Sequence, residues 1–548
     1  MRDRYVALAA AAAGLALSSA SAQAPGPLAG APQSAPVNPY LADSAYPIGH
    51  HNSAQQDSTL VRGPEGPSRA LGPADYQLRF VGPGHFGALL SAPYPDGRRV
   101  LWSNGSDRLV KLDARTFEVL AVLPKAGAPR FDQPSADAAF KALNDAPAAQ
   151  KPGAALRYAA TTMAGLAGVY TLIDRDNRVY VGSRDGVAIY GDAQPGHPES
   201  PIKLLGDWHT PHPMSGAFVG LNITYDGWII LVSEGGAVVA LSRDLKRSVT
   251  TRLQHSDEAA DYTRRAEAAG RVGYGWVRNS YAVDRDGGIY IVSAGYLHKV
   301  VWTGARLSTD PADGAWVARY RDGTGLGSGS TPALMGFGAE DRLVVITDGD
   351  RLMNVTAFWR DAPPAGWKAP PGAADPRVAG YRPADMGDPA LTAIQSEQAV
   401  VIAGNGALVV NNQPASIPAG YPPRAASLLV GLLGSDPRFT PHGLQKFMWD
   451  GRSRTLTAAW ANREVASPNT VPFVSIGSNL AYTIGVRSGR WTLEGLDWTT
   501  GASRFHYKLP DENFNALFAG LTMDGDGNII YGSPLRKIKI FRVAPKPN

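Results

Sequence analysis

The chain has ten histidines, and several of them lie where side chains could do chemistry. Five fall in segments that we interpret as loops beside strands: His85, His209, His212, His298 and His442. Imidazole is the commonest side chain for both metal ligation and proton transfer near neutral pH. If the loops meet on one face, we expect His85, His212, His298 and His442 to form a catalytic site. The alternative is that each is an isolated loop histidine bonded to water or a neighbour.

A second polar cluster is the stretch YPIGHHNSAQQDS at residues 46–58. Its two adjacent histidines stand among amides and a carboxylate, with few apolar residues to hold them in a core. The stretch is either part of a disordered leader or part of a site. We expect it to fold back across the catalytic face and to offer His50 or His51, with Gln55 or Asp57, to the substrate.

Aromatic residues and an arginine are close together in RVGYGWVRNSY at residues 271–281. Aromatic rings could stack on a sugar or an aromatic substrate, and an arginine could clamp its carboxylate. We therefore add Tyr274 and Arg278 to the catalytic candidates and Trp276 to the substrate-binding candidates. The alternative is that these rings only cover the junction between neighbouring structural repeats.

Carboxylates and amides that we expect on the same face are candidate metal ligands: Glu234, Asn222, Asn279, Glu397 and Asn515. Oxygen ligands suit calcium or another hard divalent cation, whereas histidines suit a transition metal. An asparagine at the start of a strand is also an ordinary turn residue. The cofactor prediction is therefore a divalent metal, either calcium or a histidine-bound transition metal.

A recurring unit supplies the scaffold for these residues. Segments such as IDRDNRVYVGSRDGVAIYGD and AVDRDGGIYIVSAGYLHKVVW are apolar strands joined by Asp/Gly turns, which are hairpin signals. The unit recurs at roughly 50 to 60 residues, which favours one four-stranded antiparallel sheet per repeat and a β-propeller. Less regular units at 392–465 and 471–510 bring the count to eight blades, with seven as the alternative. Helices are expected only near 134–146 and 257–271.

The last unit, at residues 515–543, supplies only three strands. The orphan strand YQLRFVG at residues 76–82 could complete that sheet and remove an exposed edge. We therefore predict an all-β fold with one propeller domain at residues 76–548. A secretion signal at residues 1–22 and an irregular, Pro- and Gly-rich leader at residues 23–75 precede it.

The N-terminus predicts the compartment. Arg2 and Arg4, an apolar run and the small residues Ala20-Ser21-Ala22 form a secretory signal pattern. No other stretch reaches the roughly 20 apolar residues of a membrane span, so we expect a periplasmic or secreted monomer. The absence of cysteine excludes covalent c-type haem and thiolate zinc sites. The net charge of +5 is spread along the chain, which argues against a nucleic-acid partner.

Three segments resemble known propellers. LVKLDARTFEVLAVL and LEGLDWTTGASRFHY resemble strand pairs of the YVTN and PQQ-type propellers, and NSYAVDRDGGIYIVSAG is similar to the NHL, SMP-30 gluconolactonase and strictosidine-synthase-like propellers. The lactonase resemblance implies a central metal, with Asn222, Asn279 and Asn515 beginning inner strands. PQQ alcohol dehydrogenases resemble the chain in length and blade number. Their vicinal cysteine pair is impossible here, so neither PQQ nor haem is expected.

Three functions follow from these observations. The favoured one is a secreted hydrolase or lyase that acts on a small organic or glycan substrate at the channel mouth, through histidines with or without a divalent metal. The second is a binding or scaffolding propeller without chemistry. The third is an iron propeller resembling carotenoid-cleavage oxygenases, which need four converging histidines. The gathering of titratable side chains on one expected face favours the enzyme.

Overall fold

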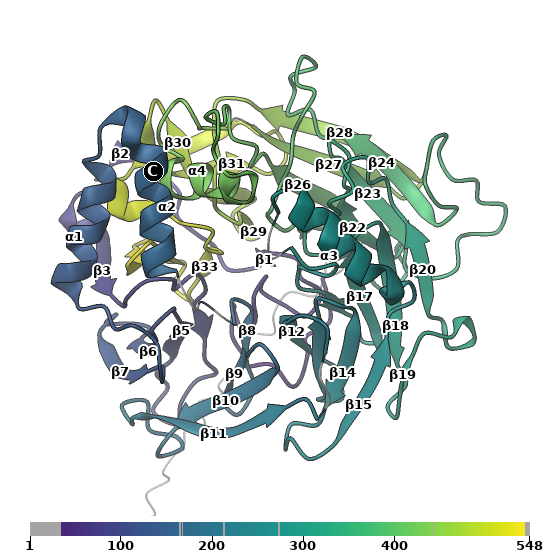
Figure 1. Ribbon diagram of the computed structural model, residues 1–548, viewed down its shortest axis with the longest axis horizontal. Helices are drawn as coiled ribbons and strands as arrows, with labels where there is room; N and C mark the ends of the chain where they lie inside the picture. The colour runs from purple at the N-terminus through teal and green to yellow at the C-terminus, as the bar shows by residue number, and fades with distance from the viewer. Residues whose placement is uncertain are drawn as a thin grey trace, which may run out of the picture.

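The computed structural model describes residues 34–163, 166, 168–211, 214–271, 274–441 and 443–542 (Figure 1). The expected secretion signal, the first part of the expected leader, and both His212 and His442 lie outside the described residues. Within the described residues, no helix is long and apolar enough to cross a membrane.

In the described residues, eight sheets of mainly antiparallel strands surround a central channel (Figure 1). From the channel outwards, blade 1 contains β4 (Leu89–Leu90), β5 (Val100–Asn104), β6 (Arg108–Asp113) and β7 (Val119–Pro124), and blade 2 contains β8 (Thr171–Ile173), β9 (Val179–Gly182), β10 (Gly186–Asp192) and β11 (Ile202–His209). Blade 3 contains β12 (Phe218–Ile223), β13 (Ile229–Ser233), β14 (Ala237–Leu241) and β15 (Ser248–Arg252). Blade 4 contains β16 (Ala282–Val283), β17 (Gly288–Ser293), β18 (Tyr296–Trp302) and β19 (Leu307–Ser308), and β20 (Trp316–Arg319) also pairs with β18.

Blades 5 to 8 continue the ring, and two short N-terminal strands flank blade 7. Blade 5 contains β21 (Ala333–Met335), β22 (Leu343–Thr347), β23 (Asn354–Trp359) and β24 (Val378–Pro383), and blade 6 contains β25 (Val401–Ala403), β26 (Gly406–Val410), β27 (Leu444–Asp450) and β28 (Thr455–Asn462). Blade 7 contains β29 (Phe473–Ser475), β30 (Leu480–Arg487), β31 (Arg490–Asp497) and β32 (Ser503–Lys508), flanked by β1 (Ser58–Thr59) and β2 (Arg69–Ala70). Blade 8 contains β33 (Thr522–Met523), β34 (Ile529–Gly532), β35 (Arg536–Ile540) and β3 (Tyr76–Phe80).

The eight-bladed fold confirms the prediction, and seven blades are excluded. Strand β3 is the outer strand of blade 8, as predicted. It pairs antiparallel with β35, from Tyr76 opposite Ile540 to Phe80 opposite Arg536. The last sheet therefore combines strands from both ends of the described chain, which removes one open edge of the ring.

The Asp/Gly turns form because an aspartate side chain binds the turn's own backbone. In blade 4, Asp284 Oδ1 accepts hydrogen bonds from the backbone N–H groups of Asp286 and Gly288, and its Oδ2 accepts one from the Tyr290 hydroxyl. Asp174 and its neighbours form the same arrangement in blade 2. These carboxylates are therefore used to stabilise hairpins, as the turn chemistry predicts.

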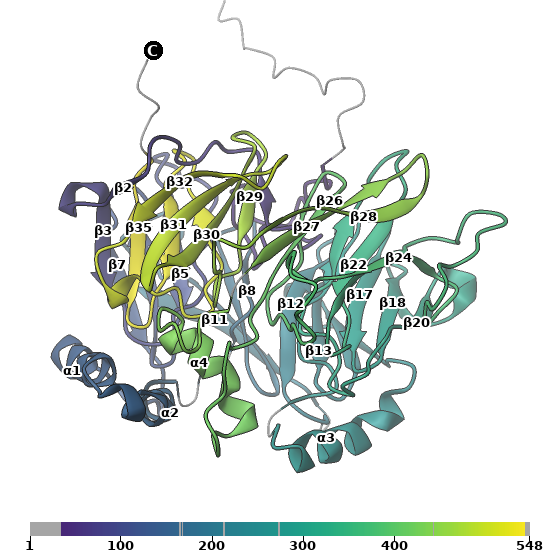
Figure 2. The same cartoon turned by 90° about the horizontal axis from the view of Figure 1, so that it is seen from above.

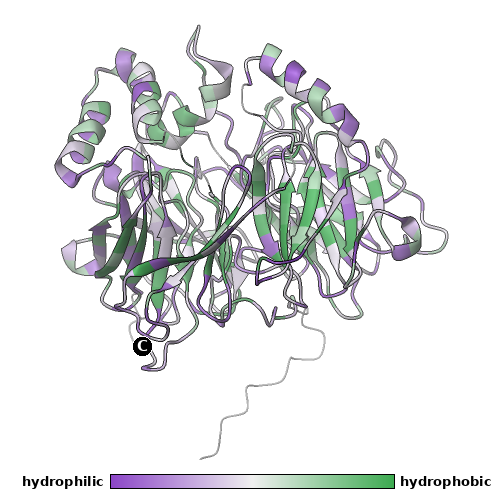
Figure 3. Ribbon diagram, turned by 60° about the horizontal axis from the view of Figure 1, so that its bottom comes forward, coloured by the Kyte–Doolittle hydropathy of each residue, from purple (hydrophilic) through white to green (hydrophobic). Residues whose placement is uncertain are grey.

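The core lies between neighbouring blades. Strands such as β13 and β17 are buried along their whole length, because each sheet packs against another sheet on both faces. Such strands have continuous apolar runs rather than an alternation of apolar and polar residues. Figure 3 shows this as largely hydrophobic strands inside the blades, whereas helix α3 is mostly hydrophilic.

Four helices lie on one face of the propeller (Figure 2). They are α1 (Gln133–Asn144), α2 (Lys151–Thr162), α3 (Ala259–Ala268) and α4 (Ala426–Leu433), with short 3-10 helices at Pro73–Asp75, Ala148–Gln150, Ser256–Glu258, Pro311–Asp313, Pro423–Ala425 and Glu512–Phe514. Helices α1 and α3 overlap the two predicted helices, whereas α2 and α4 were not predicted. All four occur in loops between blades or between the second and third strands of a blade. We call the side that carries them the helix face.

Residues 38–59, which we name the channel strap, run through the central channel. Their hydrogen bonds reach the inner strands of seven blades: Leu90 N to Tyr46 O, Ile173 N to Pro47 O, Asn38 Nδ2 to Ile223 O, Val283 N to Ser53 O, Leu334 N to Ala54 O, Ile402 N to Gln56 O and Val474 N to Asp57 O. The channel edges of these strands would otherwise expose unpaired backbone groups. The strap therefore satisfies them and is itself fixed in the channel.

The strap enters the channel from the side opposite the helices. Phe80, at the end of β3, packs in the same apolar cluster as residues of α1, α2 and α4, so β3 ends at the helix face and Tyr76 starts at the opposite one. The chain before Tyr76 must therefore approach from that opposite face. The sequence led us to expect that this segment folds back across the channel mouth. In the structure it passes through the channel instead.

Candidate functional site

A recess of about 280 Å³ opens at the centre of the ring. Most of its lining residues directly precede or begin the inner strands of blades 1, 2, 5, 6, 7 and 8, and the strap supplies the remainder. We call it the channel pocket. Its polar lining includes His50, Tyr170, Thr331, Glu397 and Gln398. Side chains from sequence-distant segments therefore meet in one cavity.

The strap brings a buried His-Asp-His group to this pocket. Nδ1 of His50 lies 2.8 Å from Asp57 Oδ2, and Nδ1 of His51 lies 3.2 Å from Asp57 Oδ1. A carboxylate oxygen only accepts, so both Nδ1 atoms must carry the hydrogen. Nε2 is then the ring nitrogen of each histidine that remains for another partner. Nε2 of both histidines is buried without a hydrogen-bond partner.

The carboxyl of Asp57 is ionised in this arrangement. Burial raises its pKa, but the charges and hydrogen bonds of His50 and His51 outweigh burial and lower the pKa below its ordinary value. Asp57 therefore stays a carboxylate at neutral pH and holds the His50 ring in one tautomer. This combination, an imidazole oriented by a carboxylate, is the arrangement of a general base.

The backbone of the strap is strained at the residues that carry this chemistry. φ is 65° at His50, 72° at His51, 58° at Gln55 and 52° at Asp57. Left-handed conformations of such residues cost of order 1–3 kcal/mol each and persist only where the surroundings enforce them. The bonds to seven blades supply that enforcement. Strain of this kind concentrates at functional sites.

Tyr170 lies beside His50 in the pocket, with 5.9 Å between the ring centroids. Burial, reinforced by the charge of Glu397, raises the pKa of Tyr170 against the lowering effect of the Thr331 hydroxyl. The phenol therefore stays protonated at neutral pH and can donate a proton or a hydrogen bond. The pocket thus places an acid next to the His50 base.

Glu397 occupies another part of the pocket wall and is positioned by Arg278. Nη1 of Arg278 lies 3.1 Å from Glu397 Oε2, and its Nη2 donates to Ser328 O at 3.1 Å. The guanidinium also lies over the Tyr274 ring, 4.5 Å from the centroid. Burial lowers the pKa of Arg278, but Glu397 and the nearby tyrosines raise it above its ordinary value. The structure thus brings two predicted catalytic candidates, Tyr274 and Arg278, together with Glu397, which the sequence predicted as a metal ligand.

His85 and His298 are not brought to this pocket. His85 is fully buried with Nδ1 2.9 Å from Ser103 Oγ, and burial together with Lys537 lowers its pKa well below its ordinary value. His298 is buried with Nε2 2.8 Å from Ser293 Oγ, and burial lowers its pKa to about 3. Both rings are therefore neutral, and neither is among the described residues that line the channel pocket. Their catalytic role stays a prediction.

Trp276 is also buried, in the apolar cluster shared by blades 3 and 4. Its ring lies 5.7 Å from the His298 ring, and its exposed fraction is 2%. Its position matches the alternative that the sequence left open, a ring that covers the junction between neighbouring blades. The predicted contact between Trp276 and substrate has no support from this position.

The amide candidates for metal binding are used by backbone groups. Asn222 Nδ2 donates to Ser53 O and Tyr281 O, and Asn279 Nδ2 donates to Ser328 O. Asn515 Nδ2 donates to Gly431 O. Glu234 Oε2 accepts from the backbone N–H of Ala217. Over the described ranges, no group of three or more His, Asp or Glu side chains is arranged to hold a metal ion, and the metal site stays a prediction.

Gln55 supports the strap from within. Its Nε2 donates to the carbonyls of Gly49 and Asn52, on either side of the histidines. The side chain is fully buried and is not among the described residues of the pocket lining. It therefore shapes the turn that carries His50 and His51.

Of the described residues that line the pocket, the sequence predicted His50 and Glu397; those that it missed include Tyr170, Thr331 and Phe518. The available signal was positional. Tyr170 and Thr331 stand directly before inner strands β8 and β21, in the loops that we expected to face the channel mouth. Tyrosine, threonine and phenylalanine are ordinary residues at such positions, so their types did not distinguish them.

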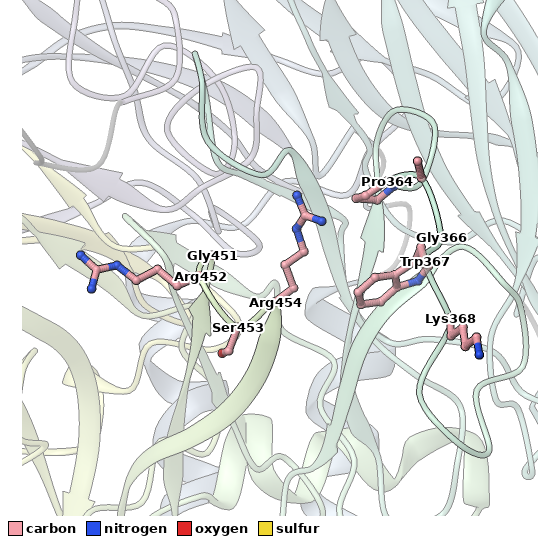
Figure 4. A pocket seen from close by; sticks show the side chains of 9 residues that line it. Pro364, Gly366, Trp367, Lys368, Gly451, Arg452, Ser453 and Arg454 are labelled. Carbon is pink, nitrogen blue, oxygen red and sulfur yellow. The ribbon is translucent and has the colours of Figure 1, made fainter.

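A second recess, of about 320 Å³, lies between residues 364–368 and the hairpin 451–454. Figure 4 shows Arg454 extending between the two loops, while Arg452 and Lys368 extend away from the gap. Arg454 also lies 3.6 Å from Asp341. The charged groups of this recess therefore do not converge, in contrast to those of the channel pocket.

The chain has a sequence relative and a structural neighbour among known proteins. No family model matches the chain. An uncharacterized protein of Archaeoglobus fulgidus is 30% identical over 523 residues, which cover 93% of this chain and 89% of that protein. The quinohemoprotein alcohol dehydrogenase ADHIIG of Pseudomonas putida HK5 has a TM-score of 0.51 at 11% identity, covering 92% of this chain and 82% of its own. The C-terminal WD40 domain of Sif2 has a TM-score of 0.43 at 9% identity, covering 85% of this chain and 98% of its own.

Proposed function

The chain belongs to the same family as the uncharacterized Archaeoglobus fulgidus protein, and we propose that it is an acid–base lyase acting on a small organic substrate in the channel pocket. His50 is the general base, Asp57 orients it, and Tyr170 is the general acid. Glu397, held by Arg278, binds a hydroxyl or amide of the substrate. The N-terminal signal pattern supports a site of action in the periplasm or outside the cell.

The observation that carries the proposal is the state of His50. Its ring lines the pocket, its Nδ1 is bound to a carboxylate, and its Nε2 has no partner. A buried polar atom without a partner costs about 1–3 kcal/mol, and the backbone at His50 is strained as well. A purely structural residue at this position gives no reason for either cost. A proton acceptor poised for substrate gives a reason for both.

The chemistry of an elimination fits the two groups. His50 Nε2 takes a proton from a carbon next to a carbonyl or carboxylate, and the electron pair of that C–H bond forms the new C=C bond. The bond from the neighbouring carbon to its oxygen leaving group breaks with its electron pair, and the Tyr170 hydroxyl protonates the departing oxygen. His50 then returns its proton to Tyr170 through solvent, so atoms and charge balance.

The size of the pocket limits the substrate. About 280 Å³ accommodates a small organic molecule or one sugar ring. The strap fills the channel behind the pocket, so a polymer is able to insert an end but not to thread through the ring. This supports a small molecule or a chain terminus as substrate.

The test compares the wild-type protein with H50Q and with H197Q, a matched control at an exposed histidine in the loop between β10 and β11. Each protein is incubated with a mixture of bacterial and plant small molecules, and substrate loss is followed by mass spectrometry. We expect compounds that wild type and H197Q consume to be consumed at least about 100-fold more slowly by H50Q. Equal consumption by H50Q overturns the proposal.

The products identify the reaction class. In an elimination the product masses sum to the mass of the substrate, and no label enters from ¹⁸O-water. Products that gain one water and carry ¹⁸O show that the same residues perform hydrolysis, which overturns the lyase assignment while keeping the role of His50.

A further inference from the structure

The channel pocket also has an apolar side that the proposed reaction does not use. Phe86, Val169 and Phe518, which we name the apolar lip, line the same cavity as His50 and Tyr170. The exposed fraction of Val169 is 48%, and both phenylalanines are only partly buried. Apolar side chains left open at the rim of a concave polar site are typical of ligand contact.

Polar side chains fix two of these residues. Lys537 Nζ donates to His85 O at 2.7 Å and to Gly87 O at 2.6 Å, so it holds the backbone on both sides of Phe86. Asn104 Nδ2 donates to the carbonyl before Val169, Gly168 O, at 2.8 Å. The positions of both lip residues are therefore imposed by the propeller rather than left to a free loop.

Phe518 is held at the lip against a backbone cost. φ is 41° at Leu517 and 62° at Phe518, although neither residue type favours the left-handed region. Asn515 stabilises this turn, because its Oδ1 accepts from the Leu517 N–H while its Nδ2 donates to Gly431 O of helix α4. A Cβ at Gly431 would lie 2.5 Å from the Phe518 ring. Helix α4 therefore has a glycine where the ring needs room.

We propose that the substrate carries an apolar ring or alkyl group that packs on the apolar lip, and that Phe518 is the residue that selects it. This deepens the proposed function and rests on it for the reacting group, which lies on the His50 side. The substrate is then an amphipathic molecule, with a polar carbonyl-bearing part toward His50 and Tyr170 and an apolar part toward Phe86, Val169 and Phe518. A fully hydroxylated sugar does not match that division.

The test uses two neutral probes that differ only in the ring, phenylacetamide and acetamide. Neither carries charge, so the carboxylates of Asp57 and Glu397 do not bias the comparison. Binding to the full-length protein is measured by saturation-transfer NMR titration. We expect phenylacetamide to bind at millimolar concentration and acetamide to bind at least about tenfold more weakly, because burying a ring of this size is worth at least that factor.

Substitutions in the apolar lip test whether phenylacetamide binds there. F518A is expected to weaken phenylacetamide about tenfold, F518L to weaken it less, and V169S to weaken it measurably. V119S is the matched control, since Val119 is 41% exposed on the outer strand β7. Circular dichroism and thermal unfolding of each variant identify a folding defect, and F518L and V169S decide the question if F518A fails to fold.

Equal binding of the two probes, no binding of phenylacetamide, or binding that both F518L and V169S leave unchanged overturns the inference. The outcome is separable from that of the proposed function, because H50Q tests turnover and the lip variants test ring-dependent binding. If Phe518 controls ring-dependent binding but H50Q leaves turnover unchanged, the apolar lip is supported as the substrate contact and the role of His50 as general base is refuted.

Discussion

Replacing Asp57 with asparagine should release the channel strap without unfolding the ring. The carboxylate accepts one hydrogen bond from each of His50 and His51. An asparagine has a single acceptor oxygen, so its NH₂ group must face one of the two Nδ1–H groups. One histidine then either loses its partner or shifts its hydrogen to Nε2, which removes the lone pair from that atom.

The expected magnitude follows from the bonds that are lost. A hydrogen bond to a charged group contributes about 1.5–3 kcal/mol. D57N loses one of the two histidine hydrogen bonds and weakens the other, and the removal of a buried charge partly offsets this loss. We therefore expect the free energy of strap opening to fall by about 3 kcal/mol, which is about 150-fold in the opening equilibrium. Because the strap is bound to seven blades through separate hydrogen bonds, we expect this loss to appear as local opening.

Hydrogen exchange measured by mass spectrometry tests this directly. The amides of Leu334, Ile402 and Val474 donate to strap carbonyls, so D57N should increase their exchange rates about 100-fold. D524N is the matched control, because Asp524 stabilises a turn of blade 8. Exchange at the three amides within about threefold of wild type would refute the reasoning.

Acid should reproduce part of the effect of D57N. The pKa of Asp57 is lowered in the folded protein, so its stabilising contribution is present above its unfolded pKa of about 4 and is lost as the pH falls through the folded value. At neutral pH wild type and D57N should differ fully. The difference should shrink only below about pH 4.

Three further predictions concern the ring. His298 has a pKa lowered by burial to about 3, so between about pH 3 and 6.5 the unfolded chain binds more protons than the folded one. Acidification over this range should therefore lower the unfolding free energy by up to about 1.4 kcal/mol per pH unit. When the unfolding free energy is measured by urea titration at each pH, its dependence on pH should be weaker in H298Q than in wild type. The pKa of Lys537 is lowered by burial to about 7, so the unfolding free energy should rise between about pH 7 and 10.5; an unchanged slope in K537M would contradict this. G431A should displace the Phe518 ring and lower phenylacetamide affinity about tenfold while the thermal midpoint changes by only a few degrees; unchanged affinity would show that α4 does not position the ring.

The number and order of the blades could be read from the sequence because a hairpin is a local structure. Apolar strand segments joined by turns such as that of Asp284 specify two strands and their connection within about 20 residues. The pairing of residues 76–80 with β35 was also predictable. The last unit lacked a fourth strand and one strand had no assigned sheet, so pairing the two completes the blade and removes an exposed edge. Helix α4 was missed because its run ASLLVGLL has no helical alternation of polar residues and packs on most sides.

The sequence by itself determined that His50 and His51 stand among polar groups and that His85 lies in a connection between strands. His298, which we expected in a loop, lies in β18. Only the tertiary structure decided which of these side chains meet. A side chain expected on the correct face can still point away from the channel, as His85 in a loop and His298 in β18 do, where burial keeps both rings neutral. The strap reaches Tyr170 and Glu397 because β3 starts on the face opposite the helices and the channel edges of seven inner strands need hydrogen-bond partners. Those contacts join residues hundreds of positions apart, and no local pattern encodes them.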